Sequence, residues 1–477
     1  MLFCWSAAEA RDSSPARPAR YPPAPLPRLL VIAAFALSLP ACKTSDAAPA
    51  PPSAAPLSPS PAAAPSGVRP RAPVASAAPP QAAKATEAPV RYPFDRTHSP
   101  ITPDLAARLR GIAAKNPKAQ RDVFAKIGDS VTFSDDNLRC FAHKELELGS
   151  YAGLLPTIER FRKGNAAGTD PYRRESEAAK IGWSAWQALS GSPSPVDREL
   201  SALSPSIALV QYGTNDIEIG ALHHFADHYW NIVDHLIDRG VVPVLFTIMP
   251  RTDRVKAAEQ VPLYNAVIRG VAQARQVPLV DYFREIEKLP GKGLGKDGIH
   301  PTTFHGHRGR DACALTPDGL RHGYNLRNRL AIEALSRVSA VLSGAPAPDP
   351  VAPPLSGTGA PADPFVIPGS PFIDSRILRG AGTLDGYGCS TARPAPGPEI
   401  AYRLELPRRT ALRIFGFDRG GGEVDIHLLR DEPRPNACVA SAQRVLATTV
   451  SAGRYYVVLD RAKGGVTETL LVVFTDP

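Results

Sequence analysis

Apolar and polar positions change their pattern along this chain of 477 residues. Between residues 96 and 342, short apolar runs alternate with longer segments whose apolar residues recur at helical spacing. Such alternation is typical of parallel strands joined by helices that cover both faces of a sheet. We therefore expect an α/β domain over 96–342. The runs with the clearest strand character are 123–128, 206–213, 241–249 and 277–283.

Three segments between or after these runs predict amphipathic helices. In the segment 221–240 the apolar residues repeat every three or four positions, and Gly240 ends the repeat. A second helix is expected around 262–276, and a third after Thr316, whose hydroxyl can cap its N-terminus. The repeating apolar residues of the first segment are Leu222, Phe225, Ala226, Tyr229, Ile232, Val233, Leu236 and Ile237.

The regions on either side of this domain differ in composition. Many of the 51 prolines lie in residues 43–95, which are rich in Ala, Pro and Ser and predict a disordered tether. A second Pro/Gly-rich stretch, 343–375, predicts a linker. Beyond it, short apolar runs separated by turn signals predict a second, all-β domain over 376–477, folded as a small antiparallel sandwich.

The C-terminal runs also carry a family likeness. The spacing of "CSTARPAPGPEIAYRLEL", "DIHLL", "CVA" and "AGRYYVVLD" resembles the pre-peptidase C-terminal type of β-sandwich, an accessory domain of secreted bacterial enzymes. The resemblance implies a part in attachment or stability rather than in chemistry.

The N-terminal 42 residues predict a signal peptide. An apolar run from Leu29 to Ala41 follows Arg28; it is too short to span a bilayer and suits the apolar core of a signal peptide. It ends in "LPAC", which resembles a bacterial lipobox and implies that Cys42 is lipidated. The alternatives are an ordinary cleaved signal and a chance apolar stretch. We expect an exported protein of the bacterial cell envelope, lipid-anchored to a membrane and facing the periplasm or the cell surface.

The net charge of +9 and the pI near 9.3 raise the question of nucleic-acid binding. The basic residues are scattered, and the sequence has no Lys/Arg-rich block and no basic motif interleaved with aromatic residues. A basic pI without such a patch argues against a nucleic-acid partner.

Four cysteines remain outside the N-terminal segment, an even number that fits disulfides in an oxidising compartment. They allow three pairings, and the division into domains favours one pair within each. No CxxC motif or Cys/His cluster suggests zinc. The favoured pairs are Cys140–Cys313 and Cys389–Cys438.

Three loops that follow predicted strands carry residues able to react. "IGDS" ends in Ser130, "YGTND" contains Asn215, and "DGIHP" contains Asp297 and His300. In an open α/β sheet, ligands bind outside the carboxyl ends of the strands. We therefore expect the three loops to meet at one crevice.

The residue types in these loops suit acyl transfer. Ser130 would be the nucleophile, His300 the base that takes its proton, and Asp297 the group that fixes the histidine tautomer. The developing oxyanion needs hydrogen-bond donors. Candidates are the Asn215 side chain, the Ser130 backbone N–H and the backbone N–H of Gly182.

At these four blocks the chain resembles the SGNH hydrolase (GDSL esterase) family over about residues 120–340. The resemblance implies a three-layer α/β/α, flavodoxin-like fold and hydrolysis of ester or related acyl bonds without metal or cofactor. The Gly182 block departs from the usual flanking pattern, so Gly164 and Gly168 are alternatives for the oxyanion glycine. No GxSxG motif occurs, which argues against the α/β-hydrolase route.

Other residues near these loops have plainer interpretations. Asp216 is expected to brace its loop rather than to carry a proton. Trp183 and Trp186 are expected to pack in the core rather than stack on a sugar. Three histidines of the segment 221–240, two of them spaced i, i+4, are expected on a solvated helix face rather than around a metal. These are His224, His228 and His235.

Together these features predict a serine esterase. The expected substrates carry short acyl groups, such as O-acetyl on polysaccharide or peptidoglycan. The alternative is a non-catalytic surface lipoprotein that binds acylated glycan or a protein partner. The complete Ser, Asn, Asp and His set speaks against that alternative.

Overall fold

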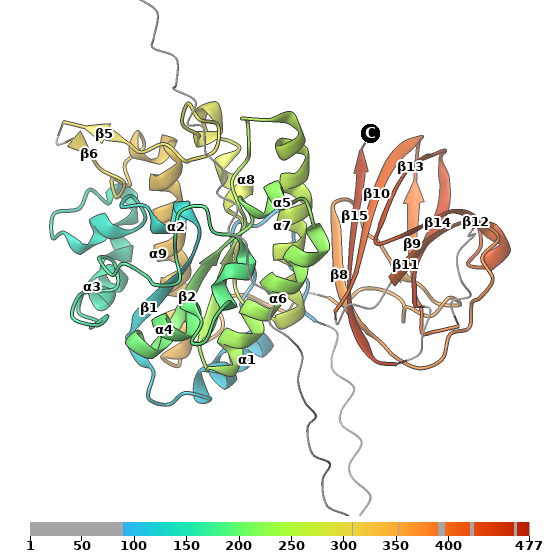
Figure 1. Ribbon diagram of the computed structural model, residues 1–477, viewed down its shortest axis with the longest axis horizontal. Coiled ribbons are helices and arrows are strands. Elements are labelled where there is room, and N and C mark those ends of the chain that lie inside the picture. The colour runs from blue at the N-terminus through green and yellow to red at the C-terminus, as the bar shows by residue number, and fades with distance from the viewer. Residues whose placement is uncertain are drawn as a thin grey trace, which may run out of the picture. The chain divides into compact units, whose positions relative to one another are not determined.

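The computed structural model (Figure 1) describes residues 89–307, 309–351, 353–389, 396–419, 424–461 and 465–476. The predicted signal peptide, the lipobox with Cys42 and most of the predicted tether lie outside these residues. Within the described ranges, no helix has the length and apolar character needed to cross a membrane.

A four-stranded parallel sheet forms the centre of the α/β domain, in the order β1-β2-β3-β4. Helices flank the sheet (Figure 1), and every residue of β2 and β3 is buried. The sequences of these strands are continuous apolar runs because both faces of the sheet are covered. Their bounds are β1 Gln120–Gly128, β2 Pro205–Gln211, β3 Val242–Phe246 and β4 Leu279–Val280.

A short segment on the outer side of β1 completes the flavodoxin-like arrangement. Gly128 forms a parallel bridge with Ala179: the Gly128 N–H donates to the Ala178 carbonyl at 3.1 Å, and the Lys180 N–H donates to the Gly128 carbonyl at 3.2 Å. The chain reaches this segment after β1 and then crosses to β2 on the other side. The strand order therefore reverses at β1, whose carboxyl end is the switch point where ligands bind in such sheets.

The helices follow the predicted alternation, but the helix predicted around 262–276 begins at Val255 and contains Pro262 in its interior. In α6 the predicted apolar stripe is buried from Phe225 to Ile237. The third predicted helix starts later, at Gly323, because the segment after Thr316 first forms a 3-10 helix; the Thr316 hydroxyl accepts from the Gly319 N–H and does not cap α9. The α-helices are α1 Pro103–Ala114, α2 Ser130–Phe133, α3 Leu155–Arg162, α4 Pro195–Leu203, α5 Asp216–Ile219, α6 Leu222–Asp238, α7 Val255–Arg275, α8 Tyr282–Ile286 and α9 Gly323–Leu342.

Short elements fill the connections. The last predicted strand run is cut to two residues because Asp281 caps α8, accepting from the Arg284 N–H at 3.2 Å. The 3-10 helices are η1 Arg139–Ala142, η2 Gly149–Leu154, η3 Ala185–Leu189, η4 Pro290–Gly293, η5 Gly319–Arg321 and η6 Pro435–Ala437, and a two-stranded hairpin is formed by β5 His305–Gly306 and β6 Gly309–Arg310.

The α/β domain begins before the predicted boundary at residue 96. Tyr92 is buried, and its hydroxyl donates to the Val277 carbonyl at 2.9 Å. The Arg269 guanidinium lies 4.0 Å from the centre of the Phe94 ring. Residues 89–95 were predicted as the end of the tether 43–95, but the buried Tyr92 ring and the partly buried Phe94 ring attach them to the domain.

The C-terminal domain consists of two packed sheets, as predicted. The sheet orders are β13-β10-β15-β8 and β12-β11-β14-β9-β7, with antiparallel pairing except between β7 and β9. Their apolar inner faces share one core. The bounds are β7 Phe365–Val366, β8 Phe372–Leu378, β9 Ile400–Leu406, β10 Thr410–Asp418, β11 Val424–Arg430, β12 Cys438–Gln443, β13 Val445–Val450, β14 Gly453–Arg461 and β15 Thr467–Asp476.

The predicted linker 343–375 is too long at its C-terminal end. Strand β7 and most of β8 lie inside it, pairing with β9 and β15. These strands are short and separated by Pro and Gly residues, so the sequence pattern hides them; their stability comes from partner strands distant in sequence.

Candidate active site

Ser130 is the first residue of α2, directly beyond the carboxyl end of β1. Asp129 caps this helix by accepting from the Val131 N–H at 3.0 Å. Gly128 leaves no room for a side chain, since a Cβ there would lie 2.2 Å from Thr132 Oγ1 and 2.5 Å from the Gln211 carbonyl. The helix therefore folds tightly over the strand end, and the serine is presented at the switch point.

The three predicted triad residues form one hydrogen-bonded chain. Ser130 Oγ lies 2.9 Å from His300 Nε2, and His300 Nδ1 lies 2.6 Å from Asp297 Oδ2. Asp297 Oδ1 accepts from the backbone N–H groups of Ile299 and His300, each at 3.1 Å. With the Nδ1 proton directed at the carboxylate, Nε2 is free to accept the serine proton.

The environment keeps Asp297 ionised. Partial burial works against the charged form, but the hydrogen bonds from His300 and from the two backbone N–H groups outweigh it, so the pKa of Asp297 lies below its ordinary value. The carboxylate can therefore stabilise a positively charged His300 during a reaction.

A glycine fixes the loop that carries the histidine. Gly298 has φ +68°, and a Cβ there would lie 2.7 Å from the backbone N of Asp253. Thr252 donates its N–H to the Gly298 carbonyl at 2.9 Å. The loop after η4 is thus held against the loop after β3.

The oxyanion candidates lie on two adjoining loops. One Asn215 side-chain N–H donates to the Trp183 carbonyl at 2.9 Å, which leaves the second N–H of that amide for a ligand. Gly182 has φ +76° in a turn closed by a hydrogen bond from the Trp183 N–H to the Lys180 carbonyl. Because residues 178–180 run beside the end of β1, this turn lies at the same edge as Ser130.

The alternatives for the oxyanion glycine lie at the opposite edge of the sheet. A Cβ on Gly164 would lie 2.0 Å from the Asp122 carbonyl, near the start of β1. The Gly168 N–H donates to Asn165, whose carbonyl accepts from the side chain of Gln120, the first residue of β1. The structure therefore brings Gly182, and neither alternative, to the switch point.

Asp216 is placed as the loop brace that the sequence led us to expect. Its carboxylate oxygens lie 3.0 and 3.2 Å from the Ala185 N, so it holds the segment that follows Gly182. Burial raises the pKa of Asp216 to about 7 and that of Asp129 to about 6.

Two buried arginines that the sequence did not single out hold the loops together. Arg251 pairs with Asp253 and Glu218 and donates to the Thr214 carbonyl at 3.0 Å. Arg327 of α9 donates to Gln211 Oε1 at 2.8 Å and also contacts Asn137. No local motif marks them, because their partners come from distant parts of the chain.

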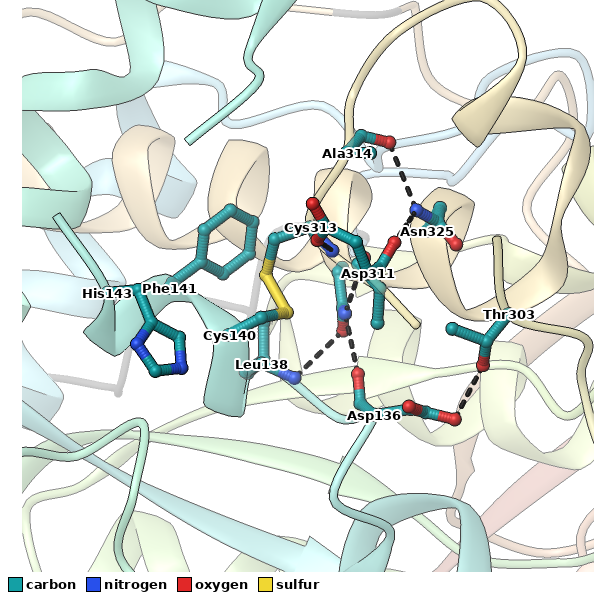
Figure 2. Close-up of a disulfide and its surroundings, with 12 residues drawn as sticks. Asp136, Leu138, Cys140, Phe141, His143, Thr303, Asp311, Cys313, Ala314 and Asn325 are labelled. Atoms are coloured by element: carbon teal, nitrogen blue, oxygen red, sulfur yellow. Dashed lines mark hydrogen bonds between the residues drawn. A yellow bond between two sulfur atoms is a disulfide. The ribbon is translucent and has the colours of Figure 1, made fainter. Parts of the chain in front are cut away.

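Figure 2 shows the disulfide that joins the segment after α2 to the segment after the histidine loop. Close to it, Asp136 accepts from the Thr303 hydroxyl at 2.5 Å. The Asn328 side chain donates to the carbonyls of Asp136 and Ala312 and accepts from the Leu138 N–H. Both predicted pairings, Cys140–Cys313 and Cys389–Cys438, are confirmed.

An apolar groove of about 330 Å³ lies beside Asp216. Trp186 lines it and is 48% exposed, so the expectation that this residue packs in the core was wrong: η3 turns its ring toward the groove. His224 and His228 line the same groove, and His235 pairs with Asp197 at 3.0 Å. Over the described ranges, no group of three or more His, Cys, Asp or Glu side chains is arranged to hold a metal ion.

Comparison with known proteins shows which family model this part of the chain matches. Residues 127–307 match the model of the GDSL-like lipase/acylhydrolase family. This range contains all five of the predicted triad and oxyanion residues. No curated protein sequence matches the chain.

Several solved structures are similar to parts of the chain. A GDSL-like lipase from Bacteroides thetaiotaomicron is 17% identical over 49% of this chain and 98% of its own, with a TM-score of 0.29. A two-domain esterase active on acetylated mannans is 12% identical over 77% of this chain and 95% of its own, with a TM-score of 0.27. The pre-peptidase C-terminal domain of a Bacillus anthracis collagenase is 13% identical over 22% of this chain and 88% of its own, with a TM-score of 0.17.

Proposed function

Because residues 127–307 belong to the GDSL-like lipase/acylhydrolase family and the protein is an SGNH-type hydrolase acting on ester bonds, we propose that Ser130, His300 and Asp297 are its catalytic triad. The observation that carries the proposal is the continuous hydrogen-bonded chain from Ser130 Oγ through His300 to Asp297. A nucleophile, a base and a group that orients the base are the parts that serine acyl transfer requires.

In the first half of the reaction, Ser130 Oγ attacks the ester carbonyl carbon while His300 Nε2 takes the hydroxyl proton. The carbonyl oxygen becomes an oxyanion, which accepts hydrogen bonds from the free Asn215 N–H and the backbone N–H groups of Gly182 and Ser130. The C–O bond to the alcohol then breaks, and His300 returns its proton to the leaving oxygen. Asp297 remains ionised and stabilises the charged histidine throughout.

The second half repeats these steps with water. His300 removes a proton from a water molecule, which attacks the acyl carbon and regenerates the oxyanion in the same place. The bond to Ser130 Oγ breaks, the serine recovers the proton from His300, and the carboxylic acid leaves. Every proton taken by the histidine is returned, so the residues alone complete the cycle.

For the substrate we propose a short acyl group, such as acetyl, on a polysaccharide or peptidoglycan. The side chains of His300 and Asp297 are 44% and 49% exposed, so the reacting groups lie at an open surface. An open site admits an ester that projects from a large carrier. A purely binding module, the alternative, has no use for a serine hydroxyl within hydrogen-bond distance of a histidine whose other ring nitrogen contacts a carboxylate.

The test is turnover of p-nitrophenyl esters from acetate to octanoate by the full chain. We expect hydrolysis that falls with chain length and a loss of at least 10³-fold in Ser130→Ala. Ser150→Ala, which changes an exposed serine of η2, is the matched control and should retain full activity. Equal rates in wild type and Ser130→Ala, or no turnover of any ester, would contradict the assignment.

The location of the protein is part of the same proposal. We infer export and attachment to a cell-envelope membrane through a lipid on Cys42, because "LPAC" ends an apolar run of signal-peptide length. The Pro-rich segment after Cys42 would serve as the tether.

A further inference from the structure

A second cavity, of about 210 Å³, opens beside α2 and takes no part in the proposed mechanism. Thr132 and Phe133 of α2 line one side, two and three residues after Ser130. That spacing corresponds to about 3–5 Å along a helix axis. The cavity therefore lies beside the short helix that carries the proposed nucleophile.

The lining of this cavity is mainly polar, and its basic residues outnumber its acidic ones. Phe133, which is partly exposed, is its main apolar contribution. The charged lining residues are Lys126, Arg139, Arg173 and Arg174 on the basic side and Asp135 and Glu175 on the acidic side.

Lys126 is an unusual residue to find there. It is 7% exposed, in the middle of the buried strand β1, and its ammonium group donates to the Tyr172 carbonyl at 2.9 Å. An ammonium group has three N–H donors, and a buried one is stabilised when further acceptors reach it. Burial lowers the pKa of Lys126 to about 8, and the negative charge of Glu199 opposes this shift.

The acidic residues do not cancel the basic ones inside the cavity. Asp135 and Glu175 are mostly exposed and pair with Arg139 at the rim. Arg174 pairs with the buried Glu199 at 2.9 Å, and Arg173 pairs with Asp170 outside the lining. A bound anion would therefore mainly neutralise the charge of Lys126.

We propose that this cavity is a subsite for a carboxylate carried by the alcohol part of the substrate, as in an acetylated sugar acid. A ligand carboxylate would replace the exposed Asp135 and Glu175 at the Arg139 guanidinium, whose forked N–H groups match a carboxylate, and would be neutralised by Lys126 as well. The volume is several times the roughly 30 Å³ that one water molecule occupies in the liquid, so a carboxylate and part of its ring fit. The inference rests on the proposed function, because it takes the ester to be bound at Ser130.

A matched pair of substrates tests the subsite. Methyl glucoside and methyl glucuronide, each acetylated at the same hydroxyl, differ by a CH₂OH group in place of a carboxylate. We expect wild type to have at least tenfold higher kcat/KM on the acetylated glucuronide, and Lys126→Met and Arg139→Gln each to remove most of that preference. Lys118→Gln removes an exposed lysine at the other end of β1 and should keep the preference.

Other results of these measurements would contradict the subsite. Equal kcat/KM values on the two sugars in wild type, or a preference that survives in both variants, would overturn the subsite. Arg139 is partly exposed, so Arg139→Gln tests the idea even if Lys126→Met does not fold. A preference seen with p-nitrophenyl monosuccinate over the acetate, but not between the two sugars, would place the carboxylate on the acyl side and overturn the assignment to the alcohol.

A binding measurement distinguishes failure of the subsite from failure of the proposed function. Calorimetric titration of unacetylated methyl glucuronide and methyl glucoside into Ser130→Ala measures the subsite without turnover. Tighter binding of the glucuronide, lost in the added Arg139→Gln change, would support the subsite even if p-nitrophenyl acetate is not hydrolysed. Equal binding of both sugars would refute it whether or not the esters turn over.

Discussion

Removal of the Cys140–Cys313 disulfide should destabilise the protein and disturb its active site, whereas removal of Cys389–Cys438 should only destabilise it. The sequence separation of 173 residues corresponds to a loss of unfolded-chain entropy of about 5 kcal/mol at 25 °C, and the separation of 49 residues to about 4 kcal/mol. Measured disulfides often stabilise a protein by less than this loss of unfolded-chain entropy. We therefore expect each Cys→Ala pair to lower the free energy of unfolding by about 2–5 kcal/mol.

The two disulfides are expected to differ in their effect on catalytic activity. Cys140–Cys313 connects the segment after Ser130 to the segment after His300, and the Asp136–Thr303 hydrogen bond remains when it is removed. A displacement of about 1 Å between nucleophile and base costs up to about 10²-fold, so we expect kcat on p-nitrophenyl acetate to fall about tenfold in the first pair.

The assays are urea unfolding and steady-state kinetics on the same preparations, with Cys389→Ala/Cys438→Ala as the internal control. Unchanged kcat in Cys140→Ala/Cys313→Ala would refute the view that this bond positions the catalytic loops. An equal fall in kcat in both pairs would refute it as well, because the second bond lies in the sandwich.

Three further predictions concern single residues. Asp297→Asn removes the acceptor for the His300 Nδ1 proton, and kcat should fall by roughly 10³–10⁴-fold at pH 7; a fall of less than tenfold would mean that another group orients the histidine. The pKa of Asp216 is raised to about 7, so the native state disfavours its ionised form and stability is lost as pH rises from about 4 to 7. Asp216→Asn keeps an acceptor for the Ala185 N–H without the charge, and its free energy of unfolding relative to wild type should rise between pH 4 and pH 8; a difference independent of pH would contradict the buried-charge account. Cys42→Ser in the full chain should move the protein from the membrane fraction to the soluble fraction and abolish labelling by radioactive palmitate; unchanged fractionation would contradict the lipid anchor.

Local patterns predicted the parts of the site that are built locally. Ser130 lies directly beyond β1, and the capping by Asp129 and the turn around Asp297 are formed by neighbours in sequence, whereas α8 and η4 separate His300 from β4. The domain boundaries failed at residues 89–95 and at β8, where order comes from distant partners.

The supporting residues of the site could not be predicted for the same reason. Arg327 contacts Gln211, and Asp136 contacts Thr303, across more than 100 residues of chain. Trp186 was assigned to the core because a large aromatic side chain is usually buried, and its exposure depends on how η3 lies against the groove. Periodicity reports which face of an element is apolar, but it does not report which distant segment meets that face.

The single bridge between Gly128 and Ala179 has a consequence for how the site can be followed in solution. A full edge strand would be held by a series of backbone hydrogen bonds along its length. Residues 178–180 are instead held to β1 by two backbone hydrogen bonds, both formed by Gly128. The Gly182 amide is therefore carried by a segment that opens more easily than the sheet itself. Amide hydrogen exchange at Lys180 should slow when an acyl group occupies Ser130, which makes this backbone position an internal reporter of the loaded enzyme.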